Sequence, residues 1–175
     1  MIDRRNLIML IIAIVAILAA WQYKNIETKK KNLEIAKQRE IKEKEIAAKN
    51  LLFMELSKSI KNKDTKSVMN LLNKEIDINR HYKNGNTPLH LAAVNKSYEI
   101  TYLLLKQGAE IDTTNDFEQT PLHLATIASA DDVVFLLIRE GANYKLVDKN
   151  SDRALDLALK RYDQPLLKVL KFLEY

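Results

Sequence analysis

Two histidines, His90 and His123, are the residues whose type and spacing could do chemistry, because they occupy the same place in two similar stretches of sequence. Imidazole nitrogens bind metal ions and transfer protons near neutral pH, so a repeated histidine raises the question of a metal site. A zinc site needs three or four ligands that converge, and no third ligand is apparent beside this pair. The third histidine, His81, falls in a segment expected to be an exposed hairpin. The histidines alone therefore do not predict a metal centre.

An acidic pair, Asp131 and Asp132, precedes an apolar helical run. Carboxylates at that place favour interaction with a helix N-terminus over a catalytic dyad. The sequence contains no glycine-rich phosphate loop, no G-x-S-x-G and no H-E-x-x-H. It also contains no cysteine, which excludes disulfides and thiolate sites. We therefore expect no enzymatic activity, no cofactor, no metal and no small-molecule substrate.

The sequence around each histidine occurs nearly twice. Residues 86–92 read Asn-Thr-Pro-Leu-His-Leu-Ala, and residues 119–125 read Gln-Thr-Pro-Leu-His-Leu-Ala. A second pair keeps the offset of 33, with Gln-Gly-Ala at 107–109 and Glu-Gly-Ala at 140–142. Two strings with one period indicate an internal repeat, which predicts stacked supersecondary units.

Each copy predicts a pair of helices. Thr87 can cap the first helix through its hydroxyl, and Pro88 can take the first helical position, where no N–H is needed. Apolar residues from Ile100 to Leu105 give the second helix a face to bury, and Gly108 follows as a left-handed cap. In the second copy the equivalent residues are Thr120, Pro121 and Gly141.

The 33-residue period and the wording Thr-Pro-Leu-His-x-Ala resemble the ankyrin repeat. The resemblance covers about residues 51–175 and is strongest in the two central copies. It implies an all-α ankyrin-repeat solenoid of about four helix-turn-helix repeats joined by short hairpin loops, with approximate repeats at 51–81, 82–114, 115–147 and 148–175. It also implies that His90 and His123 hydrogen-bond to the backbone and to the capping threonine, which ties neighbouring repeats together.

The first and last copies depart from this pattern, as terminal capping repeats do. The opening copy lacks Thr-Pro and has Glu75 at the glycine position. The closing copy loses the threonine, the proline and the histidine, and its second helix is expected to begin at Pro165. The turn glycine, kept as Gly85, is replaced by Glu118 and Ser151, so we expect those two loops to be stiffer or differently bent.

Ankyrin repeats bind proteins with their hairpin tips and the inner faces of their first helices, and the resemblance implies the same surface here. Tyr82 and Phe117 are the expected anchors, because exposed aromatic side chains dominate interface energies; the alternative is that each packs on its own hairpin. The candidate tip residues are Arg80, His81, Tyr82, Lys83, Thr114, Asn115, Asp116, Phe117, Val147, Asp148 and Lys149. The candidate inner-helix residues are Val94, Asn95, Ile127, Ala128, Lys160 and Arg161.

Residues 1–23 are predicted to be a membrane anchor or signal segment. Residues 7–21 form an unbroken apolar run behind Arg4 and Arg5. The run is shorter than the roughly 20 residues of a usual span, but Trp21 and Tyr23 can occupy the interface. A core helix would show a polar stripe along one face, and this run has none. Cleavage after its last alanines would place a bulky residue three positions before the cut, so an uncleaved single-pass anchor is preferred to a cleaved signal peptide.

The net charge of +5 lies in the first fifty residues, which hold 11 Lys and Arg against 6 Asp and Glu. The remaining residues hold 17 of each. Basic charge beside an apolar run indicates proximity to a membrane, and nucleic-acid binding is not expected. Basic residues lie on both sides of the apolar run, with arginines before it and lysines after it, so the charges alone leave its orientation ambiguous. The short N-terminal tail favours an exported or periplasmic C-terminal domain.

Residues 24–50 lack Gly and Pro and carry Glu–Lys pairs four residues apart. They predict a charged helical stalk about 40 Å long at about 1.5 Å per residue. The apolar residues do not keep a clean heptad, so a coiled coil is an alternative that the sequence does not decide. The predicted function is a membrane-tethered, non-enzymatic adaptor or scaffold for a protein of unspecified identity. The alternative is a secreted or periplasmic ankyrin protein, an inhibitor or effector released by signal-peptide cleavage.

Overall fold

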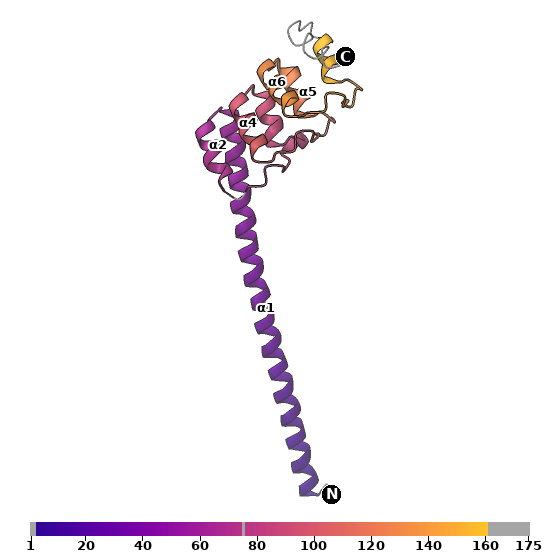
Figure 1. The fold of residues 1–175 in the computed structure, drawn as a ribbon. Coiled ribbons are helices and arrows are strands. Elements are labelled where there is room, and N and C mark those ends of the chain that lie inside the picture. The colour runs from indigo at the N-terminus through magenta and orange to yellow at the C-terminus, as the bar shows by residue number, and fades with distance from the viewer. Residues whose placement is uncertain (1–2, 75, 161–175) are drawn as a thin grey trace. The chain divides into compact units, whose positions relative to one another are not determined.

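The structure is a computed structural model that describes residues 3–74 and 76–160. Its regular elements there are helices (Figure 1), which confirms the all-α prediction. In chain order they are α1 (Arg4–Lys61), α2 (Thr65–Leu72), the 3₁₀ helix η1 (Lys83–Gly85), α3 (Pro88–Val94), α4 (Tyr98–Lys106), α5 (Pro121–Ala128), α6 (Asp131–Arg139) and α7 (Ala154–Lys160). Glu75, Arg161 and the predicted closing helix from Pro165 lie outside the described residues.

Contacts divide the chain into two compact units, residues 1–48 and 49–175. The described part of the first unit is helical from Arg4 onwards, and its side chains are exposed throughout. Local sequence accounts for this helix, because it contains neither Gly nor Pro and consists mostly of strong helix formers. An i,i+4 ion pair, Lys44 Nζ to Glu40 Oε1 at 2.7 Å, adds local support.

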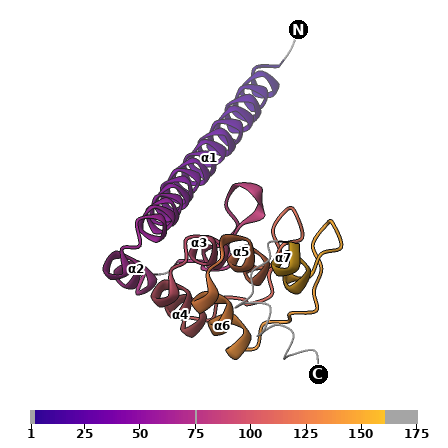
Figure 2. The same cartoon turned by 90° about the horizontal axis from the view of Figure 1, so that it is seen from above.

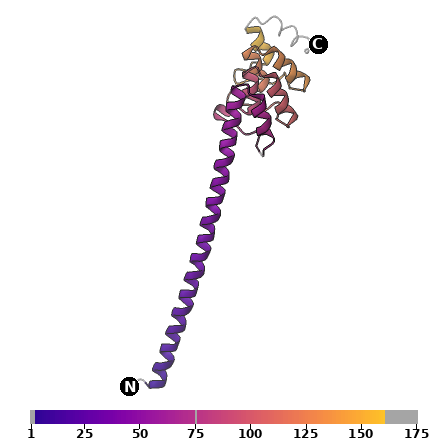
Figure 3. The same ribbon diagram turned by 90° about the vertical axis from the view of Figure 1, so that its left-hand side faces the viewer.

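The second unit consists of helix pairs arranged in two layers (Figure 2). In the inner layer α3 packs against α5, and α5 packs against α7. In the outer layer α4 packs against both α2 and α6. Figure 3 shows these pairs stacked in chain order. Each pair therefore buries its apolar faces mainly against its neighbours, as expected for a solenoid.

The end of α1 supplies the inner helix of the opening repeat. Phe53, Leu56 and Ile60 are buried there, at the helical spacing of one face. In the central repeats, small residues at the inner helices let neighbouring helices approach closely, and Ala92, Ala93 and Ala125 have no exposed surface. The large side chains that fill the core are Leu56, Ile60, Leu89, Ile100, Leu104, Leu122, Leu136 and Leu137. Burial of each contributes about 2 kcal/mol.

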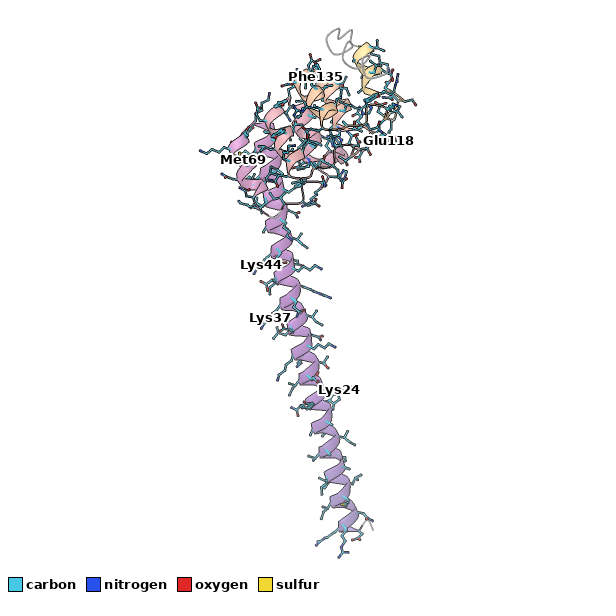
Figure 4. All side chains as sticks on the ribbon, viewed as in Figure 1. Lys24, Lys37, Lys44, Met69, Glu118 and Phe135 are labelled. Carbon is cyan, nitrogen blue, oxygen red and sulfur yellow. The ribbon has the colours of Figure 1, made fainter. Side chains whose placement is uncertain are left out.

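The loops without the turn glycine keep the bend of the loop that has it. Gly85 has φ +69°, and Glu118 and Ser151 have φ +57° and +62°. All three lie in the left-handed region, so the expectation that the two substituted loops bend differently is wrong. The exposed Glu118 (Figure 4) accepts this conformation at a cost of about 1–2 kcal/mol. The surrounding hydrogen bonds must therefore define the bend.

Candidate protein-interaction surface

The His90 imidazole joins its own repeat to the next one. The Thr87 N–H donates to His90 Nδ1 at 3.2 Å, and Thr87 Oγ1 lies 2.9 Å from the same nitrogen. On the other side of the ring, Nε2 lies 2.9 Å from the Gln119 carbonyl oxygen. Since a carbonyl oxygen only accepts, Nε2 carries the proton and Nδ1 accepts. The neutral ring therefore uses both of its nitrogens.

The next repeat reproduces this arrangement at the equivalent positions. The Thr120 N–H donates to His123 Nδ1 at 3.2 Å, and His123 Nε2 lies 3.1 Å from the Asp152 carbonyl oxygen. In the closing repeat, Arg153 and Asp156 occupy the places of the threonine and the histidine. The Arg153 N–H donates to Asp156 Oδ2 at 2.9 Å, and its guanidinium contacts both carboxylate oxygens. An ion pair thus replaces the threonine–histidine cap at the equivalent positions of this repeat.

The environment of the two imidazoles opposes acid–base and metal chemistry. Burial lowers the pKa of His90 to about 4, although the hydrogen bond to the Gln119 carbonyl acts in the opposite direction. Burial also lowers the pKa of His123. Both rings are therefore neutral at pH 7, and neither has a free nitrogen. Among residues 3–74 and 76–160, no group of three or more His, Cys, Asp or Glu side chains could hold a metal ion.

The hairpin loops are joined to one another by backbone hydrogen bonds. The Asp116 N–H donates to the Asn84 carbonyl at 3.1 Å, and the Lys149 N–H donates to the Phe117 carbonyl at 3.1 Å. These bonds repeat with the period of the sequence. The tips of three successive loops therefore form one connected row of fixed backbone.

Two of the predicted tip residues are buried inside this row. Asn115 is 7% exposed, and its Oδ1 accepts from the N–H groups of Phe117 and Gln119 at 2.9 and 3.0 Å. Asp148 is 3% exposed and accepts equivalently from Asn150 and Asp152 at 2.8 and 3.1 Å. Their side chains organise the loops and are not available to a partner. The assignment of Asn115 and Asp148 to the binding surface therefore has to be corrected.

Tyr82, one of the two expected anchors, packs against the opening repeat. Its ring stacks on Phe53 at 3.9 Å between centroids, and its hydroxyl donates to the Phe53 carbonyl at 3.1 Å. The Arg80 guanidinium lies 4.8 Å from the centroid of the Phe53 ring. Burial raises the pKa of the Tyr82 hydroxyl. Tyr82 is thus a half-buried packing residue, contrary to the expectation of an exposed anchor.

Phe53 is the residue that the sequence reasoning missed at this place. It belongs to the buried face of the opening helix. The signal that could have identified its partner is the position of Tyr82, where the next two repeats carry the loop-organising Asn115 and Asp148. A tyrosine cannot accept the same backbone hydrogen bonds, so its ring has to serve another contact.

The other tip candidates stay on the surface. Phe117 is 54% exposed and Val147 is 47% exposed. The remaining exposed tip residues are Arg80, His81, Lys83, Thr114, Asp116 and Lys149. Among them, His81 Nδ1 lies 2.6 Å from the Gly85 carbonyl oxygen. Phe117 therefore presents the largest accessible apolar side chain of the described loops.

The inner-helix candidates lie at the ends of α3, α5 and α7. Val94 is 41% exposed, whereas Asn95 is half-buried and donates through Nδ2 to the Leu91 carbonyl at 2.7 Å. Ile127 and Ala128 are half-buried. Lys160 is exposed and forms an ion pair with Asp152. These residues provide a mixed apolar and basic strip beside the loops.

Helix α1 contains a segment long and apolar enough to cross a membrane, and none of that segment is buried. The same features occur in signal sequences near an N-terminus. The exposed apolar side chains include Leu7, Ile8, Met9, Leu10, Ile11, Ile12, Ile14, Val15, Ile17, Leu18 and Trp21. Water is an unfavourable surrounding for such a continuous apolar surface.

A protein-family model described as ankyrin repeats matches the chain in three overlapping segments, residues 17–115, 53–152 and 102–173. Together these segments cover well over half of the sequence. A search of curated proteins finds no match.

Proposed function

Because the chain belongs to the ankyrin-repeat family, we propose that it is a protein-interaction module that its N-terminal helix tethers to a membrane, where it acts as an adaptor or scaffold. The family is typically non-catalytic and implies protein partners in general. The proposal adds the membrane tether, the absence of enzymatic activity and the particular surface. That surface consists of the loop tips around Phe117 and the exposed inner-helix strip.

The observation that carries the proposal is the exposed Phe117 on a fixed loop. Asn84 and Asn150 occupy the equivalent positions in the neighbouring loops, and both are polar and exposed. The fold therefore does not require an aromatic side chain at this position. The backbone around Phe117 is already held by Asn115 and by the Lys149 N–H. An aromatic side chain on a preorganised backbone loses less entropy on binding than one on a mobile loop, which favours its use as an interface anchor.

Neighbouring side chains would complete the surface. Val147 adds apolar area, and Lys83 and Lys149 add positive charge at the tips. Val94 and Ile127 contribute apolar area from the inner helices. A partner that offers a hydrophobic pocket with an acidic rim fits this arrangement, because complementary charge guides association.

The membrane tether is supported by the exposed apolar run in residues 7–21. None of the apolar window that could span a membrane is buried within the part of the chain that the structure describes. Basic residues flank the run at both ends, as they do around single-pass spans. We propose an exported or periplasmic repeat domain on a single-pass anchor.

Photo-crosslinking in intact cells tests the interaction surface. A photoreactive phenylalanine analogue at position 117 should crosslink a discrete protein partner, which mass spectrometry identifies. Phe117→Asn, which copies the neighbouring loops, should weaken affinity for that partner roughly 10- to 100-fold, the effect of losing a hot-spot side chain. Leu51→Asn is the matched control, because Leu51 is 67% exposed on α1 and belongs to neither of the surfaces considered for binding. A partner bound equally well by both variants would contradict the proposal.

A second candidate is a secreted or periplasmic ankyrin protein released by signal cleavage, because the same apolar helix fits a signal sequence. Alkaline carbonate washing of membranes and mass spectrometry of the mature N-terminus separate the two. An anchored chain stays in the pellet and retains residues 7–21. Release into the supernatant together with loss of those residues would replace the tether by secretion.

A further inference from the structure

A row of exposed apolar side chains crosses the outer helices. Met69 on α2, Tyr102 on α4 and Phe135 on α6 occupy equivalent positions of three successive repeats. They are 50%, 39% and 47% exposed, and Figure 4 labels Met69 and Phe135 on their helices. We call these three residues the outer row. The repeat thus places a large apolar side chain at the same exposed position three times in succession.

The outer row lies on the layer opposite the surface proposed for partner binding. Its helices α2, α4 and α6 pack side by side and, as equivalent elements of successive repeats, run in the same direction. A single exposed apolar residue is commonplace. Three in one register across adjacent helices form a continuous strip, which points to a contact surface.

Charged side chains flank the strip in a fixed order. Glu99 and Asp132 lie in the first turns of α4 and α6, and Lys106 and Arg139 lie in the last turns. Tyr102 is the middle residue of Tyr98–Lys106, and Phe135 is the middle residue of Asp131–Arg139. Each helix therefore carries acid, aromatic and base at offsets of about −3, 0 and +4.

This order is complementary to itself when the helix is reversed. We propose that the outer row is a self-association surface on which a second copy of the chain docks with its outer helices antiparallel. The two-fold axis runs along the outer row, so that α4 meets α4 of the second copy and α6 meets α6. Tyr102 and Phe135 then face their own counterparts, and each acidic end faces a basic end of the other copy.

The charges select this orientation over the parallel one. A parallel arrangement would place Glu99 beside Asp132 of the other copy and Lys106 beside Arg139, so like charges would meet at both edges. Like-charge contacts are unfavourable and exclude wrong orientations. A symmetric dimer needs a self-complementary patch of this kind. On α2 the equivalent flanking residues are Lys66 and Asn73, which add no opposing pair.

Lys106 and Arg139 stay accessible although both have intramolecular partners, one of which is the Tyr102 ring, whose centroid lies 5.2 Å from Lys106 Nζ. Glu140 lies 3.3 Å from Lys106 Nζ and 3.2 Å from an Arg139 nitrogen, so it holds both cations at the surface. Their side chains are still 53% and 59% exposed. Glu140 holds Lys106 and Arg139 near each other, and both can donate hydrogen bonds to a second carboxylate, from the other copy.

Single-cysteine crosslinking tests the geometry, and the chain contains no native cysteine to interfere. In full-length protein in a non-ionic detergent, Tyr102→Cys or Phe135→Cys should form a disulfide-linked homodimer under mild oxidation, because residues on a two-fold axis face their own copies. Val94→Cys, on the opposite layer, is the matched control and should crosslink several-fold less. Equal crosslinking of the control, or none at positions 102 and 135, would overturn the proposal.

A charge exchange tests orientation and does not depend on the partner-binding proposal. Glu99→Lys with Asp132→Lys should weaken dimerisation about tenfold or more in sedimentation experiments, because several exposed ion pairs become repulsive together. Adding Lys106→Glu, Arg139→Glu and Glu140→Lys should restore it, since the order is then inverted together with the residue that pairs with both basic side chains. Failure of this quintuple variant to dimerise, while its helical content and proteolytic stability match the wild type, would refute the antiparallel arrangement. Crosslinking of position 102 to a different protein in cells, with no homodimer, would also refute it.

Discussion

The repeat domain should lose stability when the pH is lowered from 7 to 5, with His90 as a principal cause. The neutral His90 ring accepts at Nδ1 from the Thr87 N–H and donates from Nε2 to the Gln119 carbonyl. Protonation would place a second N–H against that of Thr87. The ring has no exposed surface, so water cannot compensate for the lost hydrogen bond or solvate the charge.

The magnitude follows from the two pKa values. Histidine in an unfolded chain has a pKa of about 6.5, and burial lowers the pKa of His90 in the folded chain to about 4. The unfolded state therefore binds the proton first, so this stabilisation is complete above pH 6.5 and is lost as the pH falls towards 4. Between pH 7 and pH 5 the loss is about 2 kcal/mol. The lowered pKa of His123 acts with the same sign.

The carboxyl groups with lowered pKa values lose their stabilising effect below the interval from pH 7 to pH 5. The Arg153 guanidinium lowers the pKa of Asp156, and the pKa of Asp148 is also below its ordinary value. Groups with a lowered carboxyl pKa stabilise the fold above their ordinary value near 4 and lose that contribution only at more acidic pH. A fall in stability between pH 7 and pH 5 therefore reports the buried histidines.

Urea unfolding of the full-length protein in a non-ionic detergent, followed by pulse proteolysis at pH 7 and pH 5, measures the effect. His90→Gln should be less stable than the wild type at pH 7. It should also lose about 2 kcal/mol less stability than the wild type on going to pH 5. An equal loss in both proteins, or a His90 NMR signal that titrates near pH 6.5 in the folded state, would refute the reasoning.

Three substitutions in the loops test how the backbone row is held, with urea unfolding as the measurement. Gly85→Ala should cost about 2 kcal/mol or more, because a Cβ would lie 2.6 Å from the Asp116 backbone nitrogen at a left-handed φ. Glu118→Gly should stabilise the fold by about 0.5–1 kcal/mol, because it relieves the positive φ; a loss would show that the Glu118 side chain contributes. Asn115→Ala should cost about 2 kcal/mol, because two backbone N–H groups lose their acceptor; an unchanged midpoint would contradict its organising role.

The sequence was sufficient for the helix pairs because their causes are local and repeated. Thr-Pro sets the start of α3 and of α5, and the same motif folds in the same way in both repeats. Contacts outside the period were less accessible. Tyr82 stacks on Phe53, which belongs to the opening repeat, where the motif is absent. Asn115 was assigned to the binding surface from its place in the family pattern, whereas its side chain accepts hydrogen bonds from the N–H groups of Phe117 and Gln119.

The conformation at Gly85, Glu118 and Ser151 shows that residue type alone does not determine the bend of the loops. Residue preference would assign a left-handed φ to glycine alone of the three, yet all three adopt it. What they share is the hydrogen bond of their N–H to the carbonyl three residues earlier, at Tyr82, Asn115 and Asp148. Backbone hydrogen bonds between loops then fix each tip against the next. Because the backbone of the row is determined by these bonds, side chains such as that of Phe117 are free to vary without affecting the fold, and their identities are the part of the loops that a partner can select.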